Sequence, residues 1–464
     1  MSTLKVKELI DVLSSGEVKL FRNYLDSKPI NSSEIMSKLF ELLLTDASIS
    51  KENIFRKLLG NEKYNDKKIR YLFSELTAHL EKFITLIEFE KDTEEFSLFK
   101  QKSLSIRSAH KAYSFAMQNS PVKSEKANAT SYLNTFRSIE IANDFDSKHL
   151  SRLSQLNYSS LLNNLDLFYF TKKLQLQCEL INLKNVLNKE HDVVLIDPIC
   201  EYLKANRFLN SPLVEVYYNI LITLNSTESD SETSFSKILV LTQEHQSILS
   251  IEDLKNIYQY EKNFCIRRIN KGEDNYRHIL FNLYKTILAN KRIMNHEYFS
   301  QWEFKNIVTL GLRLKEGEWT KNFISKYINF LPPSERKNAL TYNTAMLYYY
   351  SKSYKFVLKY LQEVEFTDLY YQLDSKSILL KVYFETDEQE ALLHHIAAFK
   401  VFLSRNKNIS SYQLTIYKNF IRYSLKIFRA GTNTGKLNIL KKEIASSSNI
   451  SDRNWLLERI NEVL

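Results

Sequence analysis

The residues most suggestive of phosphate chemistry are Gly431-Thr-Asn-Thr-Gly435-Lys436, a glycine-containing stretch that ends in lysine. A nucleotide-binding P-loop has four residues between its glycines, follows a β-strand, and places Ser or Thr after the lysine to hold Mg²⁺. Here the loop is one residue short, Leu437 follows the lysine, and the preceding residues have the pattern of a helix. We therefore interpret Gly431 as the C-cap of a helix.

Histidine and cysteine, the usual side chains of metal and nucleophile sites, show no useful spacing. His394 and His395 are neighbours, so on a helix they point about 100° apart, whereas a shared metal needs a pair such as i and i+4. Cys178, Cys200 and Cys265 are far apart and form no close pair of the kind found in zinc and redox motifs. We interpret the cysteines as small buried hydrophobic residues. We predict no catalytic site, no metal site and no cofactor.

A run of positive charge is the strongest candidate for a binding surface. Residues 401–442 include nine Lys or Arg and no Asp or Glu, and residues 301–464 carry +8 of the net charge of +10. Four of these cations fall within an arc of about 80° on one predicted helix: Lys418, Arg422, Lys426 and Arg429. Such a patch suits an acidic protein surface, nucleic acid phosphates or anionic lipid. The alternative is an ordinary solvated helix face.

Composition predicts that helices present these residues. The chain of 464 residues contains only 7 Gly and 6 Pro, whereas strand-rich and nucleotide-binding α/β folds need glycine at turns and phosphate loops. A hydrophobic fraction of 44% provides ample material for a packed interior. The most apolar stretch, residues 213–224, is too short for a bilayer, which takes about 20 apolar residues. The N-terminus lacks the apolar core of a signal peptide, so we expect a cytoplasmic protein.

A 34-residue period runs through the C-terminal part of the chain. Four residues at this interval are predicted to lie early in the second helix of successive helix pairs: Phe323, Val357, Ala391 and Leu425. In the preceding helices, Gly311 and Ala345 fall where two helices cross closely and only a small residue fits. Pro332 follows the first pair, where a helix must stop. Residues 303–430 therefore resemble tetratricopeptide repeats, whose helix pairs stack into a solenoid.

This resemblance implies a binding groove. In tetratricopeptide arrays the first helix of each repeat lines a concave face that takes a peptide or protein. The matching positions form an aromatic, weakly basic wall: Tyr342, Met346, Tyr349, Tyr350, Lys376, Leu380 and Tyr383. Tyrosine suits such a surface because it offers a wide contact area and a hydroxyl while losing little side-chain entropy. The alternative is that several of these tyrosines pack between repeats.

Residues 1–100 are predicted to form a separate helical cap domain. Ser50 can cap a helix over residues 51–59 that stops at Gly60, and a long helix follows from about Asp66 to Phe89. This unit resembles the helix pair of a winged-helix DNA-binding domain. Three cations would then begin the recognition helix: Lys67, Lys68 and Arg70. The net charge of residues 1–100 is −1 and no β-rich wing follows, so DNA binding is the less favoured interpretation.

Residues 101–302 show helical periodicity without a regular repeat, and we predict irregular helix pairs there. Two polar stretches, residues 118–131 and 225–236, are predicted to be loops; the second is dense in Ser, Thr, Asp and Glu. Residues 431–464 are predicted to form capping helices with a more polar outer face.

Over nearly its whole length the chain also resembles an uncharacterised family of long bacterial tetratricopeptide-like proteins. The residues that carry this likeness are Phe21-Arg22-Asn23-Tyr24-Leu25 with Asn31, Tyr64-Asn65-Asp66-Lys67-Lys68-Ile69-Arg70, Asn263-Phe264-Cys265-Ile266, Ile269-Asn270-Lys271-Gly272 and Phe304-Lys305-Asn306-Ile307-Val308. The resemblance implies a fold and supplies no activity.

Together these patterns predict an all-α fold, an α-solenoid of antiparallel helix pairs with an N-terminal helical cap domain. The predicted function is a non-enzymatic scaffold or adaptor. It would bind a protein or peptide, acidic in character, through the groove and the basic helix. The alternative is a nucleic-acid-associated regulator that contacts DNA with its N-terminal helices and uses the solenoid as a sensor or docking arm.

Overall fold

The computed structural model describes residues 2–26, 34–45, 49–60, 62–123, 127–149, 157–187, 196–225, 228–294, 299–363, 369–447 and 449–464. Within these ranges the chain forms 24 α-helices, three short 3-10 helices and no strand. A single bridge between Ala127 and Leu249 is the one extended pairing in the described part of the chain. The predicted all-α class is confirmed. No described helix has both the length and the apolar character needed to cross a bilayer.

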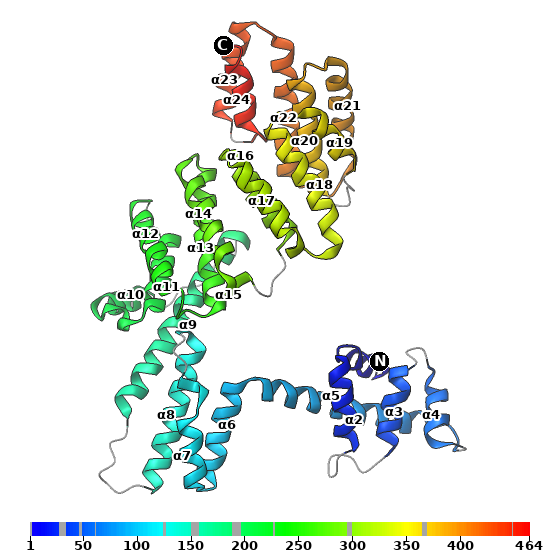
Figure 1. Cartoon of the computed structure of the whole chain (residues 1–464), viewed down its shortest axis with the longest axis vertical. Helices are drawn as coiled ribbons and strands as arrows, with labels where there is room; N and C mark the ends of the chain where they lie inside the picture. Colours follow the sequence, from blue (N-terminus) through cyan, green and yellow to red (C-terminus); the bar gives the residue numbers. More distant parts are fainter. Residues whose placement is uncertain are drawn as a thin grey trace. The chain divides into compact units, whose positions relative to one another are not determined.

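Contacts divide the chain into two compact units, Met1–Ile257 and Tyr258–Leu464. The division falls inside α13 (Ile251–Asn270), within the predicted irregular region. The first unit contains α1 (Ser2–Asp11), α2 (Ser15–Asp26), α3 (Glu34–Thr45), α4 (Lys51–Leu59), α5 (Asp66–Lys91), α6 (Thr93–Ile106), α7 (His110–Gln118), η1 (Pro121–Lys123), α8 (Ala129–His149), α9 (Tyr158–Leu187), α10 (Ile196–Ala205), η2 (Arg207–Asn210), α11 (Pro212–Asn225) and α12 (Glu228–His245) (Figure 1).

The second unit contains α14 (Asn275–Ala289), α15 (Lys291–Met294), α16 (Gln301–Arg313), α17 (Gly317–Tyr327), η3 (Ile328–Phe330), α18 (Pro333–Tyr350), α19 (Tyr354–Glu363), α20 (Leu369–Glu385), α21 (Gln389–Arg405), α22 (Ser411–Ala430), α23 (Thr434–Ser446) and α24 (Arg453–Asn461).

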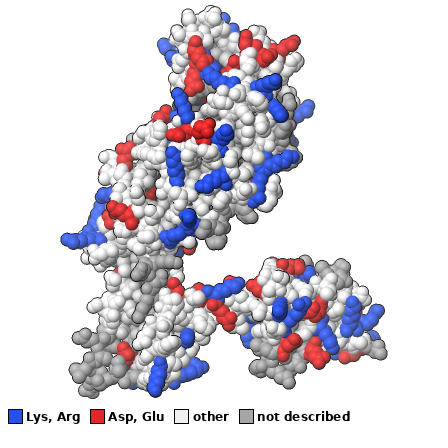
Figure 2. Space-filling view, in the orientation of Figure 1, with Lys and Arg blue, Asp and Glu red and all other residues white. Residues whose placement is uncertain are grey.

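Helices α1–α5 share one apolar core, and α5 supplies its longest face. The predicted stripe on α5 is buried: Ile69, Leu72, Leu76, Leu80 and Phe83. The predicted bounds of α4 are also confirmed. The Ser50 side chain accepts a hydrogen bond from the Asn53 amide, and Gly60 ends the helix with a φ of 63°, a conformation that suits glycine. On the face that Figure 2 shows, cations and anions are interspersed over these N-terminal helices.

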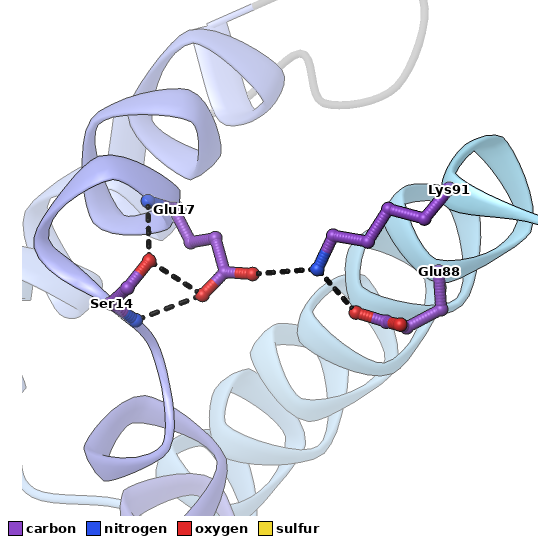
Figure 3. A network of polar contacts seen from close by, with 4 residues as sticks. All are labelled: Ser14, Glu17, Glu88 and Lys91. Carbon is purple, nitrogen blue, oxygen red and sulfur yellow. Dashed lines mark hydrogen bonds and ion pairs between the residues drawn. The ribbon is translucent and has the colours of Figure 1, made fainter. Parts of the chain in front are cut away.

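The N-terminus of α2 is fixed by a reciprocal capping pair (Figure 3). Ser14 Oγ accepts a hydrogen bond from the Glu17 amide (3.3 Å), and Glu17 Oε2 accepts one from the Ser14 amide (2.9 Å). Glu17 Oε1 lies 3.5 Å from Lys91 Nζ, which also pairs with Glu88 at 2.6 Å. The first turn of α2 is therefore bound to the last turn of α5. Hydrogen bonds from Ser14, followed by the Lys91 charge, hold the pKa of Glu17 below its ordinary value of 4.5.

One predicted loop is wrong. Most of residues 225–236 belong to α12, which begins at Glu228; residues 226 and 227 lie outside the described residues. The hydroxyls of Thr233 and Ser236 donate to carbonyls four residues earlier, which is how such residues are accommodated inside a helix. Phe235 is buried, and α12 packs along α11. Tertiary packing thus outweighs a composition typical of loops.

Helices α16–α23 form four consecutive pairs (Figure 1), a packing compatible with a helical repeat. The first helices of these pairs begin at Gln301, Pro333, Leu369 and Ser411, so the interval between them grows from 32 to 36 to 42 residues. The strict 34-residue period is therefore an average over the early pairs.

The four residues of that period do not all occupy equivalent places. Phe323 and Val357 are buried on the second helices of their pairs, and Ala391 is partly buried on the third. Leu425, however, lies near the end of α22, the first helix of the fourth pair, so its predicted place in a second helix is wrong. The cause is the length of α22, which continues for 20 residues to the C-cap at Gly431. Fully buried Leu437 occupies the early position in α23.

The predicted close crossing at Gly311 is confirmed. A Cβ at this residue would lie 2.3 Å from Thr320 Oγ1 on α17. Thr320 is fully buried and its hydroxyl donates to the Glu316 carbonyl at 2.7 Å, so it cannot move aside without losing that bond.

We expect Gly311→Ala to lower the free energy of unfolding by about 1–3 kcal/mol, because the added methyl overpacks the crossing of α16 and α17. Urea denaturation measures this change. Gly317→Ala is the matched control, since nothing lies within 4 Å of a Cβ there, and it should be neutral or stabilising by up to about 1 kcal/mol. Equal stabilities of the two variants would contradict the close crossing.

Glu17→Gln should lower the free energy of unfolding near neutral pH, where ionised Glu17 accepts from Ser14 and pairs with Lys91. The folded-state pKa of Glu17 is depressed, so this contribution is present above its unfolded pKa and is lost as pH falls through the folded pKa. The stability difference between wild type and variant should therefore shrink in acid, as measured by urea denaturation over a pH series. Exposed Glu90→Gln is the control. A difference independent of pH would rule out this role.

Candidate functional site

The four cations of the predicted basic helix lie together on α22. Lys418, Arg422, Lys426 and Arg429 are all exposed. The Arg422 guanidinium is 4.7 Å and the Lys426 ammonium 5.4 Å from the ring centroid of Tyr423. Lys426 also pairs with Glu443 of α23 at 3.3 Å. The structure thus presents four aligned cations from one long helix, two of them resting on a buried aromatic ring.

The seven predicted groove residues do not form one surface. Tyr342, Met346 and Leu380 are buried, so they pack within the helix array and offer no surface to a partner. Lys376 and Tyr383 contact α21 instead: the Lys376 ammonium lies 4.8 Å from the Phe402 ring and Tyr383 packs against His395. Of the remaining two, Tyr349 is partly buried and Tyr350 is exposed. The growing interval between pairs explains this: offsets of 34 residues do not land on the same face of α20.

The inner face of α20 carries a different set of residues, at steps of seven and four: Asp374, Lys381 and Glu385. Asp374 accepts hydrogen bonds from Lys305 Nζ of α16 and, at 3.2 Å, from Tyr417 Oη of α22. The Lys305 ammonium lies 5.4–5.6 Å from three ring centroids, those of Trp302, Tyr342 and Tyr371. A half-buried cation is therefore held by one carboxylate and an aromatic cage.

Lys381 repeats this arrangement further along the face. Its ammonium is 2.7 Å from Asp452 Oδ1 at the start of α24. It lies 5.9–6.0 Å from the ring centroids of Tyr349, Phe420 and Trp455. The two lysine cages thus connect alternate inner helices: α16 with α20, and α20 with α24.

Glu385 is the most heavily shared acid of the inner face. Its side chain is 8% exposed and lies 3.7 Å from the Arg459 guanidinium. Three donors bond to its carboxylate, the hydroxyls of Tyr349 and Tyr354 and the indole nitrogen of Trp455. Burial, and then the Glu385 charge, raises the pKa of Tyr349 far above its ordinary value, so its hydroxyl keeps the proton that it donates.

These contacts place α24 on the inner face of the array. Asp452, Trp455 and Arg459 lie three and four residues apart on one side of α24, and each contacts α20. Leu456 and Ile460 are fully buried in the core of the same pairs. The C-terminal helix therefore fills the surface that the sequence predicted to be an open groove.

The predicted nucleic-acid contacts lie at the start of α5, and two of them are engaged locally. Lys68 pairs with Glu62 at 2.6 Å, and Arg70 pairs with Asp66. Lys67 is exposed. Anions and cations also alternate over these helices in Figure 2. The arrangement lacks a one-sign surface of the kind that phosphates favour.

The cysteines and histidines show no shared site in the described residues. Cys178 and Cys265 are buried, as predicted, and burial raises the pKa of Cys265 to about 12, so its thiol is a poor nucleophile. Cys200 is half-buried. His395 bonds the Lys376 carbonyl while His394 is exposed, so the two diverge. Among the described residues no three His, Cys, Asp or Glu lie close enough to hold a metal.

Sequence reasoning missed an exposed apolar stripe on α9. Its members follow steps of four, three, four and seven residues, which keeps them on one side of the helix: Tyr158, Leu162, Leu165, Tyr169 and Leu176. The opposite side, with Leu174 and Cys178, is buried. The apolar pattern of this segment predicted a helix but could not tell which of its two apolar sides would face solvent.

Comparisons with protein-family models, curated proteins and solved structures give no match to this chain. The tetratricopeptide likeness therefore rests on the residues themselves. Of the residues that carry the wider resemblance, Phe21, Phe264 and Phe304 are buried core residues, and Asn31 lies outside the described residues.

Replacing Glu385 tests whether its carboxylate organises the inner face. Glu385→Ala leaves the charge of Arg459 and three donors without their acceptor, so we expect the free energy of unfolding to fall by about 3 kcal/mol. Glu385→Gln should cost less, because its amide oxygen still accepts. Exposed Glu388→Ala is the control. Urea denaturation measures all three, and a loss for Glu385→Ala no larger than for Glu388→Ala would contradict the assignment.

Proposed function

We propose that this chain is a non-enzymatic scaffold that binds an acidic segment of a partner protein on the exposed face of α22. The observation that supports this most directly is the line of Lys418, Arg422, Lys426 and Arg429 on one ordered helix. The first three are four residues apart, or about 6 Å along the helix. Carboxylates one turn apart on a partner helix have the same spacing, so each can meet a cation.

The scaffold itself is proposed to be a tetratricopeptide-like solenoid. Four consecutive helix pairs, the close crossing at Gly311 and the buried Phe323 and Val357 support this class. The unequal intervals between pairs make it a divergent member. Because α24 covers the inner face, the proposed partner site is on α22, outside the predicted groove.

An acidic protein is favoured over nucleic acid as the partner. The DNA-binding alternative used Lys67, Lys68 and Arg70, and two of these already pair with acids of the same helical unit. A nucleic acid also gains from many distributed cations, whereas the cations of α22 form one short line.

Charge reversal tests this proposal. In the full chain, Lys418→Glu, Arg422→Glu and Arg429→Glu together should weaken binding of poly-L-glutamate by about tenfold or more at low salt and flatten its salt dependence. Lys426 is left unchanged because it pairs with Glu443. The control reverses three exposed lysines elsewhere in the second unit, Lys321, Lys352 and Lys355, for the same change in net charge.

Fluorescence anisotropy at two salt concentrations gives both quantities. Equal loss in the two triple variants would assign binding to net charge and overturn the α22 site. Tighter, equally salt-dependent binding of duplex DNA by the wild type would favour the nucleic-acid alternative.

A further inference from the structure

The contacts of α24 are more specific than those a capping helix requires. Covering the end of a helix array takes apolar packing, which Leu456 and Ile460 provide. In addition, a carboxylate, an indole and a guanidinium on one side of α24 each contact a charged group of α20. These are Asp452 on Lys381, and Trp455 and Arg459 on Glu385. Directional polar contacts of this kind specify one partner and one orientation.

The helix is also short. It spans nine residues, whereas isolated helices below about 12–15 residues are marginal in water. Its helical state therefore depends on the surface to which it is bound. The segment that precedes it is joined to α22 by single hydrogen bonds, such as Asn419 Nδ2 to the Asn449 carbonyl at 2.9 Å and the Ser451 amide to the Ile416 carbonyl.

We propose that α24 is an internal ligand of the inner face, and that a partner helix with the same pattern can replace it. The pattern is an acidic residue, Trp three residues later and Arg four residues after that. Simple release of α24 would expose Trp455, Leu456 and Ile460 to water, which is unfavourable. Exchange avoids most of this cost, because the incoming helix buries the same surface and satisfies Lys381 and Glu385.

This second docking surface is separate from the basic face of α22. Its groups, Lys381 and Glu385, lie on α20, whereas Lys418, Arg422 and Arg429 are exposed on α22. Either site can therefore fail without affecting the other.

The test uses the wild-type full chain and a synthetic peptide of residues 449–464. At about 1 mM peptide, comparable with the effective concentration of a tethered segment, we expect about half of the molecules to have a displaced α24. Hydrogen–deuterium exchange should then show faster uptake by the amides of α24, while those of α20 and α22 stay protected.

Two altered peptides define the specificity. Asn454→Ala with Glu458→Ala changes exposed residues of α24, and this peptide should act like the native one. Trp455→Ala with Arg459→Ala removes two of the three recognising groups and should leave α24 protected. Unchanged exchange of α24 at saturating native peptide would show that the helix is a fixed terminal cap. Equal action by all three peptides would also overturn the proposal.

Discussion

The second unit depends on pairing half-buried cations with carboxylates across alternate inner helices. Lys305 with Asp374 and Lys381 with Asp452 follow the same plan, in which aromatic rings surround the ammonium and one acid neutralises it. Burying either charge alone would be costly, so each group constrains the helix that carries its partner. Glu385 adds a third link of this kind through Arg459. These pairs explain why the inner face is full rather than hollow: the aromatic rings that could have lined a groove surround lysines of the chain itself.

The sequence predicted much of the architecture and little of this network. Helix ends with local signatures were predictable: Ser50 and Gly60 bound α4, and Gly431 ends α22, because capping depends on neighbours in the chain. The close approach at Gly311 was predictable for a similar reason, since two helix backbones can come this near each other only where a residue has almost no side chain.

Pairings such as Lys305 with Asp374 join residues far apart in sequence, and no local pattern reveals them. A constant offset of 34 residues could not find them either. The first helices of successive pairs begin 32, 36 and 42 residues apart, and each residue of drift rotates a position by about 100° around its helix. This is why Tyr342 and Leu380 are interior residues while Asp374 and Lys381 carry the inner face. On α22 the basic residues belong to one continuous helix, so their alignment needed no assumption about the repeat.

The links between alternate helices have a consequence for how the unit comes apart. In most repeat arrays each repeat touches only its immediate neighbours, so the ends fray and stability is close to a sum of adjacent terms. Here α16 is joined directly to α20, and α20 to α24, each past an intervening inner helix. Loosening the terminal helix therefore disturbs a pair that is not adjacent to it. Such second-neighbour coupling favours melting of α16–α24 as a single cooperative block, with less progressive unravelling from the ends.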